Sequence, residues 1–464
     1  MIFHAKPNHR PKAVAPFAAM VLMAVVFLLF RPLPAGAVDI QEVTSESGVT
    51  AWLVEDHNNP VISVRIAFEG GAALDPKGKS GLARMVASLL DEGAGEMDSQ
   101  AFRAALEERS INLSFSAGED GLYGTLQTLT ENREKAFELM GLAVTAPRFD
   151  PEPVSRIRSQ ILSSLARDLS DPGTIARRSF YALVFPDHPY GVPSDGYPES
   201  IEAIDREDLA SFVADRLARD RLLIGVAGDI TPEELKPLLD SAFATLPASA
   251  KPFEIPEADV AGAGEIGVHE MNVPQSSVVF GHSGLKRSDP DYYAASIVNY
   301  ILGGGSFASR LFEEIRDKRG LAYSVYTYLR TLDHAGMVMG GIGTANARVK
   351  DSLEVIREEW RRLAEEGPSA EEVENAKTYL TGSFPLNLTS TDSIASLLVG
   401  VQIEDLGIDY INRRNDLIEA VSLEDARRVA AELLKPDQLS VVVVGKPAGV
   451  EATVELPAAD GKGS

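Results

Sequence analysis

The sequence contains the same order of features twice, and this internal duplication limits the folds that the chain can adopt. One strand-like stretch ends in Glu69-Gly70-Gly71, and a second leads into Gly281-His282-Ser283-Gly284. Each is followed by an apolar helical run that ends in glycines, over residues 81–90 and 293–302. Equivalent positions lie roughly 215 residues apart, which is much too far for a solenoid repeat. The chain therefore carries two copies of one domain.

The later part of each copy also follows a common plan. Apolar residues recur at helical spacing over residues 136–144 and again over residues 353–363, which predicts a long amphipathic helix in each copy. Each copy closes with a β-rich run that ends in glycine, over residues 222–228 and 439–445. Because strands are mixed with helices longer than single βαβ crossovers need, we expect the α+β class. Each copy should form a mainly antiparallel sheet with helices packed on one face.

The two copies are separated by a segment that is rich in Pro, Ala and Gly and lacks apolar periodicity. We therefore expect an N-terminal domain over residues 38–246, a linker over 247–264 and a C-terminal domain over 265–448. Residues 449–464 are interpreted as a flexible tail.

Residues 1–37 have the three parts of a secretory signal peptide. Basic residues precede an uncharged run over residues 13–30, and Ala35-Gly36-Ala37 forms the cleavage site. The alternative is an uncleaved anchor, because about 18 apolar residues can just span a bilayer. We expect cleavage before Val38, a periplasmic or otherwise exported location, and no stable membrane span in the mature chain.

Composition excludes several classes of function. Acidic residues outnumber basic ones by 68 to 44, giving a formal net charge of −24, whereas general nucleic-acid binding requires clustered Lys and Arg. The sequence has no cysteine, so it forms no disulfide, thiolate zinc site or Cys nucleophile. It also lacks a nucleophile elbow, a phosphate-binding loop and a dinucleotide fingerprint.

The order of strand, Glu-Gly-Gly, small-residue loop, Gly81-Leu82-Ala83 and helix resembles the pitrilysin/insulinase family of zinc peptidases, and the resemblance covers nearly all of residues 39–448. In active members the helix after Gly-Leu-Ala carries His-x-x-Glu-His, whose histidines bind zinc and whose Glu acts as base on the bound water. The corresponding residues here are Arg84, Ala87 and Ser88. Arg is a cation and Ala has no donor atom, so this motif is degenerate.

The resemblance places the family's third zinc ligand, a Glu, on a later helix. Residues 154–168 form that helix here and contain no Glu. The histidines that follow the predicted signal peptide are scattered singly, and we interpret them as structural or exposed; they are His57, His188, His269, His282 and His334. We therefore expect no metal or other cofactor in this chain.

Arg316 and Tyr323 match a pattern in which, in this family, an Arg and a Tyr seven residues later reach from the C-terminal half toward the zinc-bound substrate. A guanidinium group and a phenol hydroxyl can stabilise the negative charge that develops on the carbonyl oxygen during peptide hydrolysis. Arg319 and Tyr326 share the same spacing, but the flanking residues favour the first pair. The alternative interpretation is a surface Arg and a half-buried strand Tyr.

Gly303, Gly304 and Gly305 resemble the glycine-rich loop that the non-catalytic subunit of mitochondrial processing peptidase uses near its substrate. The alternative is a plain turn that enters a helix capped by Ser306.

The residues and the resemblance together predict a zinc-free subunit of a two-chain metallopeptidase. A homologous partner with an intact His-x-x-Glu-His would supply the zinc, while Arg316 and Tyr323 would hold the carbonyl of a peptide or unfolded-protein substrate. The chain alone should be inactive. The alternative is a non-enzymatic, chaperone-like module that holds extended peptides along an inner sheet edge. Both a homodimer and a heterodimer are compatible with the sequence.

Overall fold

The computed structural model describes residues 38–457, so the predicted signal peptide lies outside the described residues. From Ile40 onward the described chain forms one compact unit. None of the described helices is long and apolar enough to cross a membrane.

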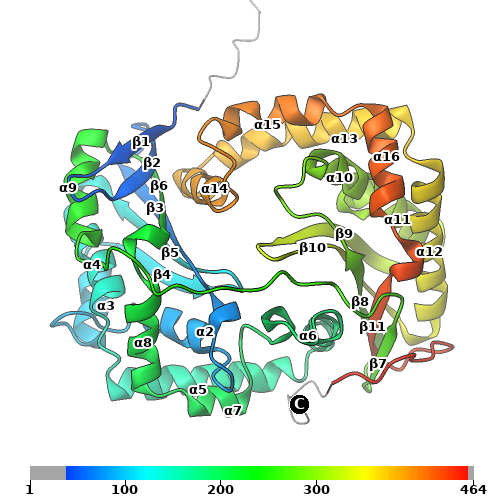
Figure 1. The fold of residues 1–464 in the computed structure, drawn as a ribbon, viewed down its shortest axis with the longest axis horizontal. Coiled ribbons are helices and arrows are strands. Elements are labelled where there is room, and N and C mark those ends of the chain that lie inside the picture. Colours follow the sequence, from blue (N-terminus) through cyan, green and yellow to red (C-terminus); the bar gives the residue numbers. More distant parts are fainter. Residues whose placement is uncertain (1–37, 458–464) are drawn as a thin grey trace, which may run out of the picture. The chain divides into compact units, whose positions relative to one another are not determined.

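Two β-sheets organise this unit, one in each copy (Figure 1). The strands are β1 (Gln41–Thr44), β2 (Thr50–Glu55), β3 (Val61–Glu69), β4 (Asn112–Ala117), β5 (Gly121–Leu129), β6 (Leu222–Gly228), β7 (Ile266–Glu270), β8 (Gln275–Ser283), β9 (Ala322–Leu332), β10 (Ala335–Ala345) and β11 (Ser440–Gly445). The first sheet has the order β1-β2-β6-β3-β5-β4, and the second has the order β7-β11-β8-β10-β9. With the edge strand β1 set aside, the two orders correspond strand for strand, as the duplicated sequence requires.

Antiparallel pairing dominates both sheets, which confirms the predicted α+β class. Strand β3 pairs antiparallel with β5 and β6, and β8 pairs antiparallel with β10 and β11. The parallel pairs are β2 with β6 and β7 with β11. In both copies the parallel pair joins an early strand to the last strand, so each copy ends beside its own beginning.

The sheets are surrounded by helices, which pack on the strands or on one another. They are α2 (Leu82–Ala87), α3 (Ser99–Glu107), α4 (Arg133–Thr145), α5 (Pro151–Asp168), α6 (Pro172–Val184), α7 (Pro198–Ala203), α8 (Arg206–Arg216), α9 (Pro232–Phe243), α10 (Tyr292–Asn299), α11 (Arg310–Phe312), α12 (Val349–Glu366), α13 (Ala370–Gly382), α14 (Thr391–Ile403), α15 (Tyr410–Glu419) and α16 (Leu423–Leu433). Helix α4 buries Leu139 and Met140, and α12 buries Ile356 and Trp360. The hydroxyl of Ser369 accepts a hydrogen bond from the backbone N–H of Glu372, which closes a capping box at the start of α13.

The two copies also exchange one helix each, which the sequence does not predict. Helix α14 of the C-terminal copy packs on β3 and β6 of the first sheet, and α6 of the N-terminal copy packs on β8 and β11 of the second (Figure 1). Each sheet is therefore covered by its own helices and by one helix from the other copy.

Specific contacts hold α14 in place on the first sheet. Arg65 of β3 donates from Nη2 to both carboxylate oxygens of Asp392, each at 2.7 Å. A Cβ atom at Gly225 in β6 would lie 2.5 Å from the carbonyl oxygen of Ala395, so the close approach of α14 requires glycine there. This packing binds the two copies into a single unit.

Part of the predicted tail is hydrogen-bonded to the second sheet. The backbone N–H of Thr453 donates to the carbonyl of Ile266 at 2.8 Å, and Val454 forms a parallel bridge to Gly267. The segment over residues 451–457 thus lies beside β7.

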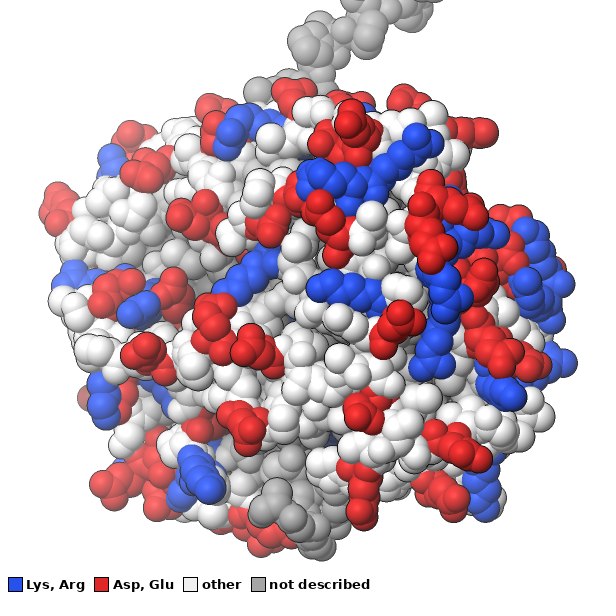
Figure 2. Space-filling model, turned by 45° about the vertical axis from the view of Figure 1, so that its right-hand side comes forward, with Lys and Arg blue, Asp and Glu red and all other residues white. Residues whose placement is uncertain are grey.

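Charged residues of both signs are interspersed on the face drawn in Figure 2. Asp and Glu occur across this face, and Lys and Arg lie between them rather than in one continuous patch. A nucleic-acid backbone is bound by clustered positive charge. This face offers no such surface.

Candidate functional site

The three positions of the degenerate zinc motif lie on α2 and directly after it. Nη1 of Arg84 lies 3.0 Å from Oδ1 of Asp195. Ala87 is buried and has no atom that could bind a metal. The hydroxyl of Ser88 donates to the carbonyl of Arg84 at 2.9 Å, so the helix itself uses it. None of the three side chains is arranged as a metal ligand.

A network of opposite charges surrounds this position. Asp195 also lies 3.6 Å from Nη2 of Arg178, and the same Nη2 lies 3.5 Å from Oδ2 of Asp168 at the end of α5. Two guanidinium groups therefore share Asp195 beside the helix on which the third ligand was expected. Nearby positive charges disfavour a bound cation. In residues 38–457, no three His, Cys, Asp or Glu side chains are grouped so that they could hold a metal ion. These residues do not fit a zinc ion.

We expect the purified chain to contain no stoichiometric zinc and to cleave no peptides, because Arg84, Ala87 and Ser88 replace the ligands and the base. Elemental analysis after zinc loading and desalting checks this, with an active relative that carries His-x-x-Glu-His as the positive control. A content of about one zinc ion per chain, as in a catalytic site, would show that a different ligand set exists.

The structure brings Arg316 and Tyr323 together. Arg316 lies in a π-helical turn, η7 (Glu313–Asp317), and Tyr323 is the second residue of β9. The guanidinium carbon of Arg316 is 4.8 Å from the centre of the Tyr323 ring, and it also lies 4.7 Å from the ring of Phe312 and 5.4 Å from that of Phe307. Such cation–π contacts hold a cation without neutralising it.

Both members of this pair remain available to a ligand. Tyr323 is 80% exposed. Among the residues that the structure describes, Arg316 forms no ion pair with a carboxylate and the hydroxyl of Tyr323 forms no hydrogen bond. A positively charged group and a phenol hydroxyl are thus presented side by side at the start of an edge strand.

The alternative register, Arg319 with Tyr326, is not assembled in the structure. Nη1 of Arg319 donates to the carbonyl of Glu314 at 2.9 Å and is also ion-paired with the Glu314 carboxylate. The ring of Tyr326 instead stacks on Tyr328, with 6.2 Å between ring centres. The geometry therefore distinguishes two registers that share one spacing in the sequence.

The glycine run has a packing reason at its first position. Gly303 lies in a π-helical turn, η5 (Tyr300–Gly304), where a Cβ atom would be 2.6 Å from Oγ1 of Thr327 in β9. Gly304 is exposed, and a substrate-binding role for Gly303, Gly304 and Gly305 stays a prediction. The predicted cap at Ser306 is wrong, because Ser309 is the residue that precedes α11 and its hydroxyl donates to the carbonyl of Ser306.

Sequence reasoning missed the aromatic residues around the pair. Phe307, Tyr326 and Tyr328 are exposed, and the two tyrosines lie on β9, which forms one edge of its sheet. Large aromatic side chains on a free strand edge suit the binding of an extended peptide. Their spacing of two residues on a predicted strand is a signal that could have indicated a common face.

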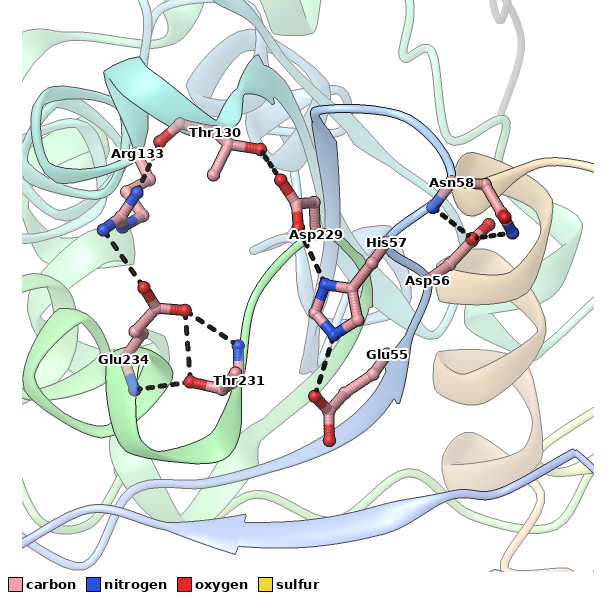
Figure 3. A network of polar contacts seen from close by, with 9 residues as sticks. All are labelled: Glu55, Asp56, His57, Asn58, Thr130, Arg133, Asp229, Thr231 and Glu234. Atoms are coloured by element: carbon pink, nitrogen blue, oxygen red, sulfur yellow. Dashed lines mark hydrogen bonds and ion pairs between the residues drawn. The ribbon is translucent and has the colours of Figure 1, made fainter.

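His57 lies between two carboxylates, and its geometry is structural (Figure 3). Its Nδ1 lies 2.7 Å from Asp229 and its Nε2 lies 3.2 Å from Glu55. The hydroxyl of Thr130 donates to the other oxygen of Asp229 at 2.8 Å, not to the imidazole. The two flanking carboxylates, Asp229 first and Glu55 second, raise the pKa of His57 above its usual value. Because the Thr130 hydroxyl is bonded to the Asp229 carboxylate and not to the His57 imidazole, this network is not a catalytic triad and instead ties three loops together.

The chain is similar to known proteins that are described as inactive or as non-peptidases. Residues 203–380, most of which lie in the C-terminal copy, match the family described as "Peptidase M16 inactive domain". The chain is 28% identical over 405 residues to "Non-peptidase homolog YmxG" of Helicobacter pylori, covering 87% of this chain and 93% of that protein. It is 24% identical over 425 residues to "Probable mitochondrial-processing peptidase subunit beta" of Schizosaccharomyces pombe, covering 88% and 92% respectively.

A solved structure gives the same result for the fold. The crystal structure of a peptidase M16 inactive domain from Pseudomonas fluorescens matches with a TM-score of 0.83 at 27% identity, covering 90% of this chain and 100% of that one. The fold and the degenerate motif define a duplicated, metallopeptidase-like protein without the zinc ligands. The chain is thus similar, over most of its length, to proteins described as non-peptidase or inactive members of the M16 (pitrilysin/insulinase) family.

Proposed function

We propose that this chain is the zinc-free subunit of an exported two-chain metallopeptidase. A homologous partner with an intact His-x-x-Glu-His motif would supply the zinc and the general base, and this chain would supply Arg316 and Tyr323. The observation that carries the proposal is the exposed Arg316–Tyr323 contact in a chain whose own motif positions are filled by Arg84, Ala87 and Ser88. A fixed cation and a hydroxyl donor are the groups that a developing oxyanion needs.

Two further observations support a shared substrate chamber. A cavity of about 430 Å³ is lined by residues of both copies, including Glu69 and Tyr123 from the first and Arg330 and Asp333 from the second. One relative is named as the beta subunit of a processing peptidase. The word subunit in that name supports assembly with another chain.

Co-expression with a His-x-x-Glu-His relative tests the association. We expect the two chains to co-elute in size-exclusion chromatography with a mass equal to one copy of each. A relative with both zinc-binding histidines replaced by Ala serves as the control, because assembly should survive the loss of zinc. Separate elution of the two chains at micromolar concentration would contradict the proposal.

A second candidate function is a module that holds extended peptides without cleavage. The observation that favours it is the edge strand β9, which exposes Tyr326 and Tyr328 and pairs only with β10 in the described part of the chain. An added strand could be bound there by backbone hydrogen bonds. This function needs peptide binding but no effect of Arg316 on hydrolysis, and that difference separates the two candidates.

We also propose export by signal cleavage, with Val38 as the first residue of the mature chain. The support is the basic, apolar and small-residue order of residues 1–37. N-terminal sequencing of protein from the periplasmic fraction should read Val38 first. Recovery of intact residues 1–30 in the membrane fraction would instead show an anchor.

A further inference from the structure

A cavity of about 340 Å³ lies between α6, the segment over residues 190–195 and the edge strand β9. It adjoins the degenerate zinc position, because Asp195 lines it and also pairs with Arg84. Tyr181 of α6 and Tyr328 of β9 contribute aromatic side chains to its lining. The cavity therefore has apolar surface together with charged groups, which is typical of a ligand site.

Positive charge exceeds negative charge in this lining. Three arginines line the cavity, Arg177, Arg178 and Arg330, against two carboxylates, Glu119 and Asp195. Nη2 of Arg330 lies 3.0 Å from Glu119, so that pair is neutral. If all five groups are ionised, one positive charge remains. One monoanion would balance it, whereas a doubly charged phosphate would leave an excess negative charge.

The excess positive charge belongs to the two neighbouring arginines of α6. Arg178 is only 9% exposed, and its Nη2 has no hydrogen-bond partner although two carboxylates lie 3.5 and 3.6 Å away. Arg177 is exposed and forms no ion pair with any residue that the structure describes. A buried donor without an acceptor is unfavourable, so an incoming anion would gain both hydrogen bonds and charge neutralisation.

Tyr328 adds an uncharged donor beside these arginines. Among the residues that the structure describes, its hydroxyl contacts only the sulfur of Met339, at 3.6 Å, which is a weak acceptor. Although the side chain is partly exposed, partial burial of Tyr328 raises its pKa to about 12, so the hydroxyl stays protonated at neutral pH. It can therefore donate a hydrogen bond to an oxygen atom in the cavity.

We propose that this cavity, formed by Arg177, Arg178 and Tyr328, binds a carboxylate of an extended peptide. The inference rests on the proposed function in one respect, namely that the ligand is a peptide. Because Tyr328 and Arg330 lie two residues apart on β9, a strand added to that edge would carry alternate side chains past the cavity. The carboxylate is that of an Asp or Glu side chain or of the peptide's C-terminus.

Fluorescence anisotropy with the isolated mature chain tests this proposal. The probes are three short fluorescein-labelled peptides of otherwise identical sequence. One has a central Glu and an amidated C-terminus, the second has Gln instead of Glu with the same amide, and the third has Gln with a free C-terminal carboxylate. We expect the Glu peptide or the free-carboxylate peptide to bind roughly tenfold more tightly than the neutral peptide, as one charge-assisted hydrogen bond provides. Which of the two binds more tightly identifies the source of the carboxylate.

Two variants link the preference to the cavity. Arg177→Gln should abolish the preference for the carboxylate peptides, because it removes a positive charge from the cavity. The variant should still fold, since Arg177 forms no ion pair with any residue that the structure describes. Arg167→Gln removes an exposed arginine of α5 outside the cavity and should leave the preference unchanged. Equal binding of all three peptides, absence of any binding, or a preference that survives Arg177→Gln would overturn the proposal. The assay needs no partner and no hydrolysis, so the two-chain peptidase and the carboxylate site can fail independently.

Discussion

Arg316→Ala should lower the kcat of the proposed two-chain peptidase by about 10²–10³-fold, which is the typical effect of removing one donor to an oxyanion. The negative charge on the carbonyl oxygen exists mainly in the transition state, so KM should change little. Tyr323→Phe should give a comparable loss, because it removes only the hydroxyl and keeps the ring against which Arg316 packs. Steady-state kinetics of the purified complex measures both effects.

Arg319→Ala is the matched control for this experiment. Arg319 lies near the same helical turn but is ion-paired with Glu314, and Lys318, whose Nζ lies 2.7 Å from that carboxylate, would remain as its partner in the variant. We expect this variant to keep nearly full activity. If Arg316→Ala and Tyr323→Phe assemble normally and also keep full activity, the chain is a scaffold or a peptide-holding module rather than half of an active site.

The chain should lose stability between neutral pH and about pH 4 because of one buried histidine. Nε2 of His282 accepts a hydrogen bond from Nε1 of Trp360 at 2.9 Å, and its Nδ1 lies 2.7 Å from the carbonyl of Ser283. The neutral ring thus satisfies both contacts, whereas a proton on Nε2 would face the indole N–H. Burial lowers the pKa of His282 to about 4, from an ordinary value of about 6.5.

The sign of the effect follows from proton binding. Below pH 6.5 the unfolded chain protonates this histidine but the folded chain does not, so the free energy of unfolding falls as the pH falls. The loss ends near pH 4 and amounts to roughly 3 kcal/mol from this group alone. Acid should therefore weaken the packing between β8 and α12.

Urea unfolding at pH 7 and at pH 4 measures this loss, with His282→Gln as the comparison. The variant should be less stable at pH 7 but should lose less stability on acidification, since it has no imidazole to protonate. Other groups, such as the buried carboxyl of Asp75, whose pKa burial raises to about 7, titrate in both proteins and cancel in the comparison. An equal loss in both proteins would show that His282 is not the acid-sensitive group.

Features with a local cause could be predicted from the sequence. The duplicated order of strands and helices led to two sheets of matching topology. The apolar stripe over residues 353–363 predicted the buried face of α12. In each case hydrogen bonds or packing within a short segment determine the structure.

Features that depend on distant segments could not be predicted in this way. An apolar helix face predicts that the helix is buried, but it does not identify the element that packs against it. The exchange of α6 and α14 between the copies therefore has no sequence signature. The ion pair between Arg84 and Asp195 joins residues far apart in the chain, and only the fold brings them together. The π-helical turns η5 and η7, which both pack against β9, were not predicted either.

The proposed role of this chain as a zinc-free subunit is tested most directly by titrating it into a fixed amount of a zinc-bearing relative with an intact His-x-x-Glu-His motif. We predict that peptidase activity rises from near zero and saturates at an equimolar ratio, while this chain without the partner stays inactive. The proposal would be contradicted if the partner alone is fully active and if adding this chain does not change its activity.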